Sequence, residues 1–135
     1  MNGKRYGKGK EYKYGSLIFE GEYLNGRRWE GKGYDNRNNI VYELKDGKGL
    51  VKEYYSNGKL LFEGEYLNGF RTGKGKEYFE DGQLLFEGDY LNGNRNGKGK
   101  EYYYNGQLKF EGEYLNGKRN GKGKEYHFED GKLKF

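Results

Sequence analysis

Paired acidic side chains are the first residues of this sequence whose types and spacing could do chemistry. Glu63 and Glu65 are two residues apart in an alternating pattern, so both carboxyl groups are expected on one face of a strand, as in a glycosidase pair. The same pair recurs as Glu20/Glu22 and as Glu111/Glu113. Because a catalytic constellation is unique in a chain, a recurring pair indicates a structural or solvating role.

Other candidates for chemistry are equally weak. His127 is the single histidine and the chain has no cysteine, so neither a zinc site nor a nucleophile–histidine arrangement is indicated. The string Gly-Lys-Gly-Lys lacks the Ser or Thr that follows Gly-Lys in a phosphate-binding loop, and it has no strand-to-helix context. We therefore predict no enzyme activity, no catalytic or metal site, no cofactor and no small-molecule substrate.

The segments that would position these residues recur along the chain. Phe62, Phe86 and Phe110 each begin the string Phe-Glu-Gly, and they stand at intervals of 24 residues. Self-similarity at such a period is typical of a stacked array, in which one unit cannot bury its apolar face alone. Residues 1–135 are thus predicted to form a single repeat array.

Each unit has the pattern of a β-hairpin. Apolar side chains alternate over residues 60–66, which predicts a first strand, and residues 73–79 form a second strand. Asn68-Gly69 follows the first strand and Asp81-Gly82 follows the second, and both are turn signals. We predict an all-β fold, an elongated single-layer antiparallel meander of hairpins with about 5–6 repeats of 24 residues.

The glycines of the second strand predict a packing arrangement. A bare glycine in a strand leaves room for an aromatic ring to lie across the backbone. We expect Gly73 and Gly75 to accept Tyr66 and Phe62 in this way. On the other face, Glu63 and Glu65 are expected to oppose Lys74 and Lys76.

The pattern is least regular between the first and the later units. The turn between Gly26 and Gly31 is longer than its counterparts, such as that between Gly69 and Gly73, and it contains Trp29, the only tryptophan. A degenerate, shortened repeat follows at about residues 34–54, with a polar stretch at 35–39 and Asp46-Gly47 as its turn. Such irregularity fits either a specific function or drift in a tolerant repeat.

Composition limits the class of protein. The mean hydropathy is −1.32 and 35% of residues are charged, which is poor material for a two-layer core, yet 19% are aromatic, which disordered chains lack. No apolar run approaches the ~20 residues of a membrane span, and there is no cysteine. We expect a cytoplasmic protein, with peripheral association with membrane or cytoskeleton as an alternative.

The repeated pattern resembles the MORN repeat (membrane occupation and recognition nexus). The resemblance rests on an aromatic-x-Gly-x-aromatic string, then Asn-Gly, then Gly-x-Gly, and it covers nearly the whole chain outside residues 35–51. The first string is carried by Phe19-Gly21-Tyr23, Phe62-Gly64-Tyr66, Phe86-Gly88-Tyr90 and Phe110-Gly112-Tyr114. The Gly-x-Gly is carried by Gly31/Gly33, Gly73/Gly75, Gly97/Gly99 and Gly121/Gly123. Choline-binding repeats share some of these features but rely on tryptophan, and this chain has one.

The resemblance implies an extended antiparallel meander with a scaffold role, as in junctophilins. Two binding surfaces are then predicted. The leading hypothesis is protein binding or self-association on an aromatic face made of Tyr23, Phe62, Tyr66, Phe86, Tyr90, Phe110 and Tyr114. The alternative is binding of anionic phospholipid, such as phosphoinositides, along a basic turn edge made of Arg27, Arg28, Arg71, Arg95, Lys118 and Arg119. We do not expect nucleic acid binding, because 21 acidic residues are interleaved with the basic ones.

Overall fold

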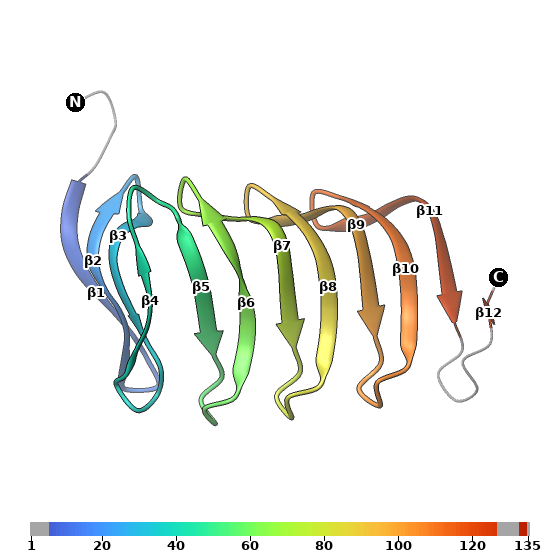
Figure 1. Ribbon diagram of the computed structural model, residues 1–135, viewed down its shortest axis with the longest axis horizontal. Coiled ribbons are helices and arrows are strands. Elements are labelled where there is room, and N and C mark those ends of the chain that lie inside the picture. Colours follow the sequence, from blue (N-terminus) through green and yellow to red (C-terminus); the bar gives the residue numbers. More distant parts are fainter. Residues whose placement is uncertain (1–5, 127–132, 135) are drawn as a thin grey trace.

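The computed structural model describes residues 6–126 and 133–134, and all of its regular elements are strands (Figure 1). These are β1 (Tyr6–Lys13), β2 (Ser16–Leu24), β3 (Arg27–Tyr34), β4 (Ile40–Leu44), β5 (Gly49–Tyr54), β6 (Leu60–Leu67), β7 (Phe70–Tyr78), β8 (Leu84–Leu91), β9 (Asn94–Tyr102), β10 (Leu108–Leu115), β11 (Lys118–Tyr126) and β12 (Leu133–Lys134). The described residues include no helix of the length and apolarity needed to cross a membrane.

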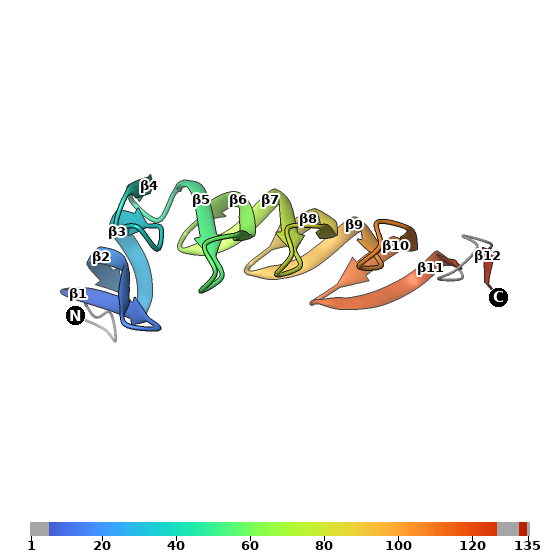
Figure 2. The same cartoon turned by 90° about the horizontal axis from the view of Figure 1, so that it is seen from below.

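The strands follow one another in space in the order of the sequence. Strands β1–β4 form one antiparallel sheet and β5–β12 a second, in which each strand pairs with its sequence neighbours. The predicted all-β antiparallel meander of hairpins is therefore confirmed, and the molecule is elongated along the direction in which the hairpins succeed one another (Figure 1). The view from below shows β1–β3 grouped at the N-terminal end, apart from the run of β5–β11 (Figure 2).

Two kinds of turn alternate along the meander. Asn68-Gly69 is a two-residue turn in which both residues have positive φ, 54° and 81°, as a tight hairpin turn of this hand requires. At the other end of the strands, residues 55–59 form a longer loop in which the Gly58 N–H donates to the Tyr55 carbonyl and the Lys59 N–H to the Asn57 side chain. Asparagine and glycine tolerate these backbone angles, which explains their recurrence at both ends.

The irregular segment keeps both kinds of turn. The polar stretch 35–39 forms the longer loop, with Asn38 at φ 67° in the place of Gly58. Asp46-Gly47 is the predicted two-residue turn, with φ values of 52° and 76°. The strands beside it, β4 and β5, have only 5 and 6 residues and are joined by a single bridge between Lys45 and Lys48. The two sheets therefore separate at the shortened unit.

The second strand of each regular hairpin bends near its beginning. Gly73, Gly97 and Gly121 have φ values of 59°, 104° and 73°, and the strand register shifts beside each of them. An extra residue on one strand bends it, and glycine is the residue that takes positive φ without strain. Figure 1 shows β7, β9 and β11 turning near their first residues.

The bend brings the hairpin tips into contact with one another. The Gly69 N–H donates to the Gly47 carbonyl at 3.0 Å, and the Gly93 N–H donates to the Arg71 carbonyl at 3.0 Å. The Gly117 N–H continues the series to the Arg95 carbonyl. Neighbouring repeats are therefore joined twice, by the strand ladders and by this second row of hydrogen bonds.

The core lies between the sheet and the folded tips. Aromatic rings cover strand glycines, as predicted, although not every predicted pair of ring and glycine occurs. Phe62 and Tyr90 lie over Gly75, where an added Cβ would be 3.1 Å and 2.8 Å from their rings. The expectation that Tyr66 covers Gly73 is wrong, because Gly73 lies at the bend and faces the carboxylate of Glu65. The covering tyrosine instead comes from the next hairpin.

Two further expectations are corrected by the register. Glu63 opposes Lys76 as predicted, but Glu65 opposes Thr72, because the shift between Gly64 and Glu65 displaces Lys74. Gly31 opposes Gly21 in the same way that Gly75 opposes Gly64, so Gly31 corresponds to Gly75 and not to Gly73. The segment between Gly26 and Gly31 is therefore shorter than its counterparts, not longer as expected.

Substitution of a covered glycine tests this packing. In Gly99→Ala the new Cβ would lie 2.6 Å from the ring of Phe86 and 3.0 Å from that of Tyr114. We expect the free energy of unfolding to fall by about 1–3 kcal/mol, as for other overpacked cores. Gly7→Ala is the matched control, because Gly7 is also in a strand and has no atom within 4 Å of an added Cβ. Equal urea midpoints for the two variants would contradict the packing.

Candidate functional site

The predicted aromatic face is not an exposed docking stripe. Phe62 and Phe86 are 0% exposed, Tyr90 and Tyr114 are 4% exposed, and Phe110 is 6% exposed. The other two members of the stripe, Tyr23 and Tyr66, are half-buried. Sequence reasoning assumed a flat sheet, whereas the bent tips cover this face. A partner could not reach these rings without displacing the tips.

The predicted basic edge is also largely engaged in contacts within the chain. Arg71 was expected in an exposed turn, but the turn ends at Gly69, and Arg71 lies in β7 opposite Tyr66. In a straight strand Tyr66 would be about 13 Å from Phe62. The Arg71 guanidinium carbon nevertheless lies 3.9 Å from the centroid of the Phe62 ring, which is a consequence of the bend. The side chains of Arg28, Arg95 and Arg119 occupy equivalent places over Phe19, Phe86 and Phe110.

Each of these arginines is held by a carboxylate. Arg95 Nε donates to Glu77 Oε2 at 3.0 Å, and the hydroxyl of Tyr90 donates to the same oxygen. The Arg95 guanidinium carbon lies 4.0 Å from the centroid of the Phe86 ring. A cation over a ring face is attracted by the ring quadrupole, and more strongly where both are removed from water. The glutamate, tyrosine and arginine form a triad that covers the phenylalanine.

The triad recurs over two other phenylalanines, and its ion pair recurs over a third. Glu11, Tyr23 and Arg28 form it over Phe19, and Glu101, Tyr114 and Arg119 form it over Phe110. Glu53 and Arg71 form the ion pair over Phe62 at 2.9 Å. All four arginines therefore have a structural partner. The expectation of an exposed basic edge is wrong for Arg28, Arg71 and Arg95, which are half-buried, whereas Arg119 is exposed. Arg27 packs over Phe70, and Lys118 is exposed.

The triads shift the protonation of their members. Burial alone would raise the pKa of Glu77, but hydrogen bonds from Arg95 and Tyr90 outweigh it and lower that pKa below 4.5. The pKa of Glu101 is lowered by the same balance. Burial raises the pKa of Tyr90, and the bond to Glu77 raises it further. The carboxylates are therefore ionised and the phenols neutral at neutral pH.

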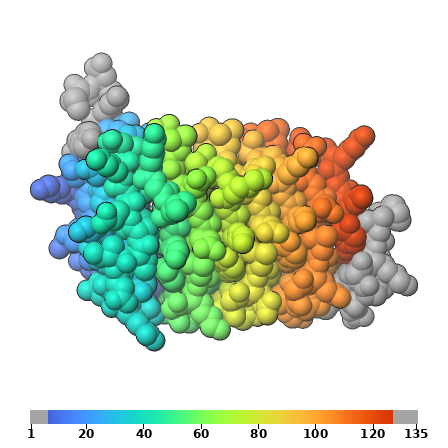
Figure 3. Space-filling view, in the orientation of Figure 1, coloured from blue at the N-terminus to red at the C-terminus, as the bar shows by residue number. Residues whose placement is uncertain are grey.

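The opposite face of the sheet carries a groove of about 850 Å³ that crosses strands β5–β11. Its floor is a row of backbone without side chains, made by Gly64, Gly75, Gly88, Gly99 and Gly112, which oppose one another across the strands. Their Cβ positions point to the ring face, where the missing side chains make room for the rings. On the opposite face, only backbone lies between the flanking side chains, and it forms a shallow channel. The channel runs along the long axis, across the successive repeats seen as bands in Figure 3.

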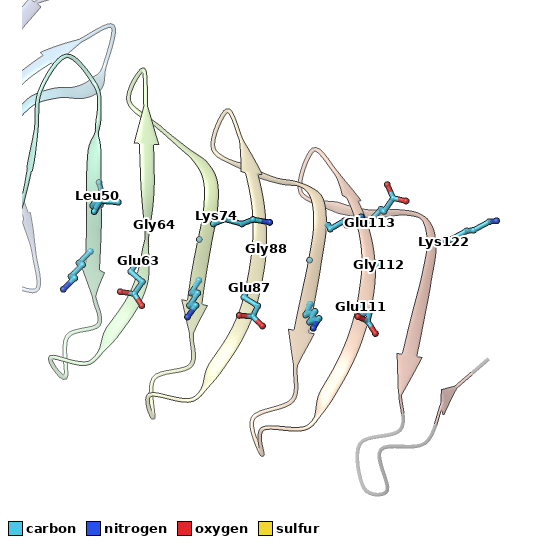
Figure 4. A pocket seen from close by; sticks show the side chains of 17 residues that line it. Leu50, Glu63, Gly64, Lys74, Glu87, Gly88, Glu111, Gly112, Glu113 and Lys122 are labelled. Atoms are coloured by element: carbon cyan, nitrogen blue, oxygen red, sulfur yellow. The ribbon is translucent and has the colours of Figure 1, made fainter.

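Two rows of charged side chains flank the floor. One row alternates in sign across the sheet, as Lys52, Glu63, Lys76, Glu87, Lys100 and Glu111. The other row contains Lys74 in β7, Lys98 in β9 and Lys122 in β11. The first two are on the same strands as Lys76 and Lys100 of the first row. Figure 4 shows Gly64, Gly88 and Gly112 between the two rows. First strands thus contribute acidic bands and second strands basic bands.

The described residues bring no group of three His, Cys, Asp or Glu side chains together for a metal ion. Several residues named from the sequence lie outside the described part of the chain, His127 among them. Sequence reasoning did identify the cross-strand charge pairs but missed the groove. The recurring strand glycines were the feature of the sequence that could have indicated the groove, but they were interpreted only as room for aromatic rings.

Comparison with protein families agrees with this architecture. The MORN repeat family matches residues 62–84, 86–108 and 110–132, together just over half of the chain. The chain belongs to the MORN-repeat family. A MORN repeat variant also matches residues 48–68, which include β5 and β6. MORN repeats are a non-catalytic repeat family, consistent with scaffolds for protein or membrane interaction. Comparison with curated proteins gave no match.

Replacement of a triad arginine tests its structural role. Arg95→Met removes the cation over Phe86 and leaves the half-buried Glu77 with Tyr90 alone. We expect a loss of about 1–3 kcal/mol in the free energy of unfolding. The control is Lys74→Met, whose ammonium pairs with Asp89 at 2.6 Å but is 84% exposed, so its loss should cost about 0–1 kcal/mol. Similar losses in urea unfolding would show that Arg95 is only a surface charge.

Acid should weaken the same triads. Glu11, Glu77 and Glu101 have a lowered pKa in the folded chain, so their contribution to stability is complete above the ordinary glutamate pKa of 4.5. This contribution to stability decreases as the pH falls below 4.5, and it is lost once the pH is below the lowered pKa of the folded chain. We expect Glu77→Gln to be less stable than the parent at neutral pH and to show a smaller loss on acidification. Parallel curves of unfolding free energy against pH would contradict this assignment.

Proposed function

We propose that this MORN-repeat chain is a non-enzymatic scaffold that binds a helical segment of a partner protein in the glycine-floored groove. The observation that carries the proposal is the groove itself, a channel of about 850 Å³ flanked by bands of alternating charge. It replaces the aromatic face, whose rings are buried, as the surface for protein binding.

The spacing of the bands favours a helix over an extended chain. Adjacent strands are about 4.8 Å apart, so the sign of the wall changes at that interval. Along one face of a helix, successive side chains at 3–4 residue steps rise by about 5.2 Å. In an extended strand, side chains on one face are about 6.6 Å apart, which does not match the bands. A polyproline helix repeats every 9.3 Å or so and meets only one sign.

The dimensions of the channel fit one row of side chains. The two walls are two residues apart along each strand, which is about 7 Å, so a whole helix cannot enter. A ridge of small or apolar side chains can lie on the glycine floor while flanking charges meet the walls. From β5 to β11 the groove spans about 29 Å, close to the length of a 20-residue helix.

Binding to an anionic membrane is the alternative. The structure leaves fewer exposed, unpaired cations for it than the sequence suggested. Four of the six residues of the predicted edge are arginines that pair with glutamates and cover rings, as the triads above describe. Arg27 donates to the Asn68 carbonyl, and the exposed cations of that set are Lys118 and Arg119, of which Arg119 is paired with Glu101. Anionic vesicles are therefore included in the test as the rival partner.

A designed peptide tests the proposal. The probe is a helical peptide of about 20 residues in which Glu and Lys alternate at 3–4 residue steps along one face. The control peptide has the same composition, with all Glu in one half and all Lys in the other. We expect the alternating peptide to bind in a titration at low salt and the control peptide to bind at least about tenfold more weakly. Equal affinities, or binding to anionic vesicles alone, would contradict the proposal.

Charge reversal locates the binding surface. The double variant Lys76→Glu with Lys100→Glu reverses two basic bands of the groove and should weaken the alternating peptide at least about tenfold. The control double variant, Lys45→Glu with Lys48→Glu, makes the same change in net charge at exposed positions outside the groove and should retain the parent affinity. An equal loss in both variants would indicate non-specific electrostatic attraction.

A further inference from the structure

The groove is nearly unchanged when it is displaced by one repeat. Each hairpin contributes one acidic and one basic band, so a shift of two strands, about 10 Å, superimposes the walls on themselves. A partner that bound through these bands alone would have several registers of nearly equal affinity. A unique register therefore needs a feature that occurs once in the groove.

Leu50 is such a feature. It lies in β5 and lines the same wall as Lys74, Lys98 and Lys122, in the place that a lysine takes in the later second strands (Figure 4). Its side chain is 71% exposed. Isolated exposed leucines are ordinary on protein surfaces. This one replaces a charge in the wall of a groove and stands at its N-terminal end.

The neighbouring strand differs at the same point. Leu50 opposes Glu65, whereas Lys74 opposes Asp89 at 2.6 Å and Lys98 opposes Glu113. Across residues 6–126, no Lys or Arg forms an ion pair with Glu65. At the end of the groove, Leu50 thus stands opposite a carboxylate that lies just outside the lining and lacks the cation its counterpart Asp89 has.

We propose that Leu50 and Glu65 set the register of the partner helix, an inference that rests on the proposed function. The partner then carries an apolar residue that packs on Leu50 and a Lys or Arg one helical turn away that pairs with Glu65. The charge-alternating part of the helix follows along β7–β11. Leu50 occurs once in the groove and distinguishes this register from every displaced one, in which the apolar residue would meet a lysine.

The test measures where a labelled helix end lies on the sheet. The probe is the alternating peptide extended at one end by a Leu and an Arg one turn apart, with a nitroxide at that end. With the ¹⁵N-labelled full chain, we expect paramagnetic broadening to centre on amides of β5 and β6. In Leu50→Lys the broadening should spread over β5, β7 and β9, because the registers become equivalent.

A double variant makes the prediction directional. Leu50→Lys with Lys74→Leu moves the leucine by one repeat and frees Asp89 from its lysine, as Glu65 is free in the parent. The centre of broadening should move to β7 and β8, a shift of about 10 Å. Broadening that is already spread in the parent, or that stays at β5 in both variants, would overturn the inference while leaving groove binding intact. A probe that binds neither chain would overturn the proposed function as well.

Discussion

The structure depends on one close approach, that of a phenylalanine ring to glycine backbone. A Cβ at Gly123 would lie 2.3 Å from Phe110, and a Cβ at Gly99 would lie 2.6 Å from Phe86, so any side chain there would exclude the ring. With the glycines bare, each ring lies flat enough to be covered on its other side by an arginine. A layered core of backbone, ring and guanidinium results, and it needs few aliphatic residues. This explains how a chain with a mean hydropathy of −1.32 can fold.

The two faces of the glycine row differ. On one side the space that the glycines leave is filled by rings, arginines and carboxylates, all satisfied among themselves; none of the described buried side-chain polar atoms lacks a hydrogen-bond partner. On the other side, the backbone of this row lies between two rows of charged side chains and forms the floor of the groove. The core and the groove therefore lie on opposite sides of one residue row.

Much of the fold could be predicted from the sequence because its signals are local. The 24-residue period, the alternation in residues 60–66 and the Asn-Gly turns each follow from backbone preferences, and the structure has strands and turns at those places. The candidate site could not be predicted in the same way. Whether Arg71 is exposed depends on the bend at Gly73, and whether Gly75 is covered by Tyr66 or Tyr90 depends on contact between repeats. Neither is encoded within a single hairpin.

The double connection between neighbouring hairpins, by strand ladder and by tip, makes every contact in the regular region a nearest-neighbour contact. Duplication of one 24-residue unit would therefore lengthen the array by about 10 Å without altering any existing interaction. Loss of a unit would shorten it by the same step. Within the described sheets, the junction between β4 and β5 is where such gain or loss of a unit would not preserve the interactions, because no strand ladder joins these two strands. The length of the groove can therefore change in evolution by whole units, on the C-terminal side of the junction between β4 and β5.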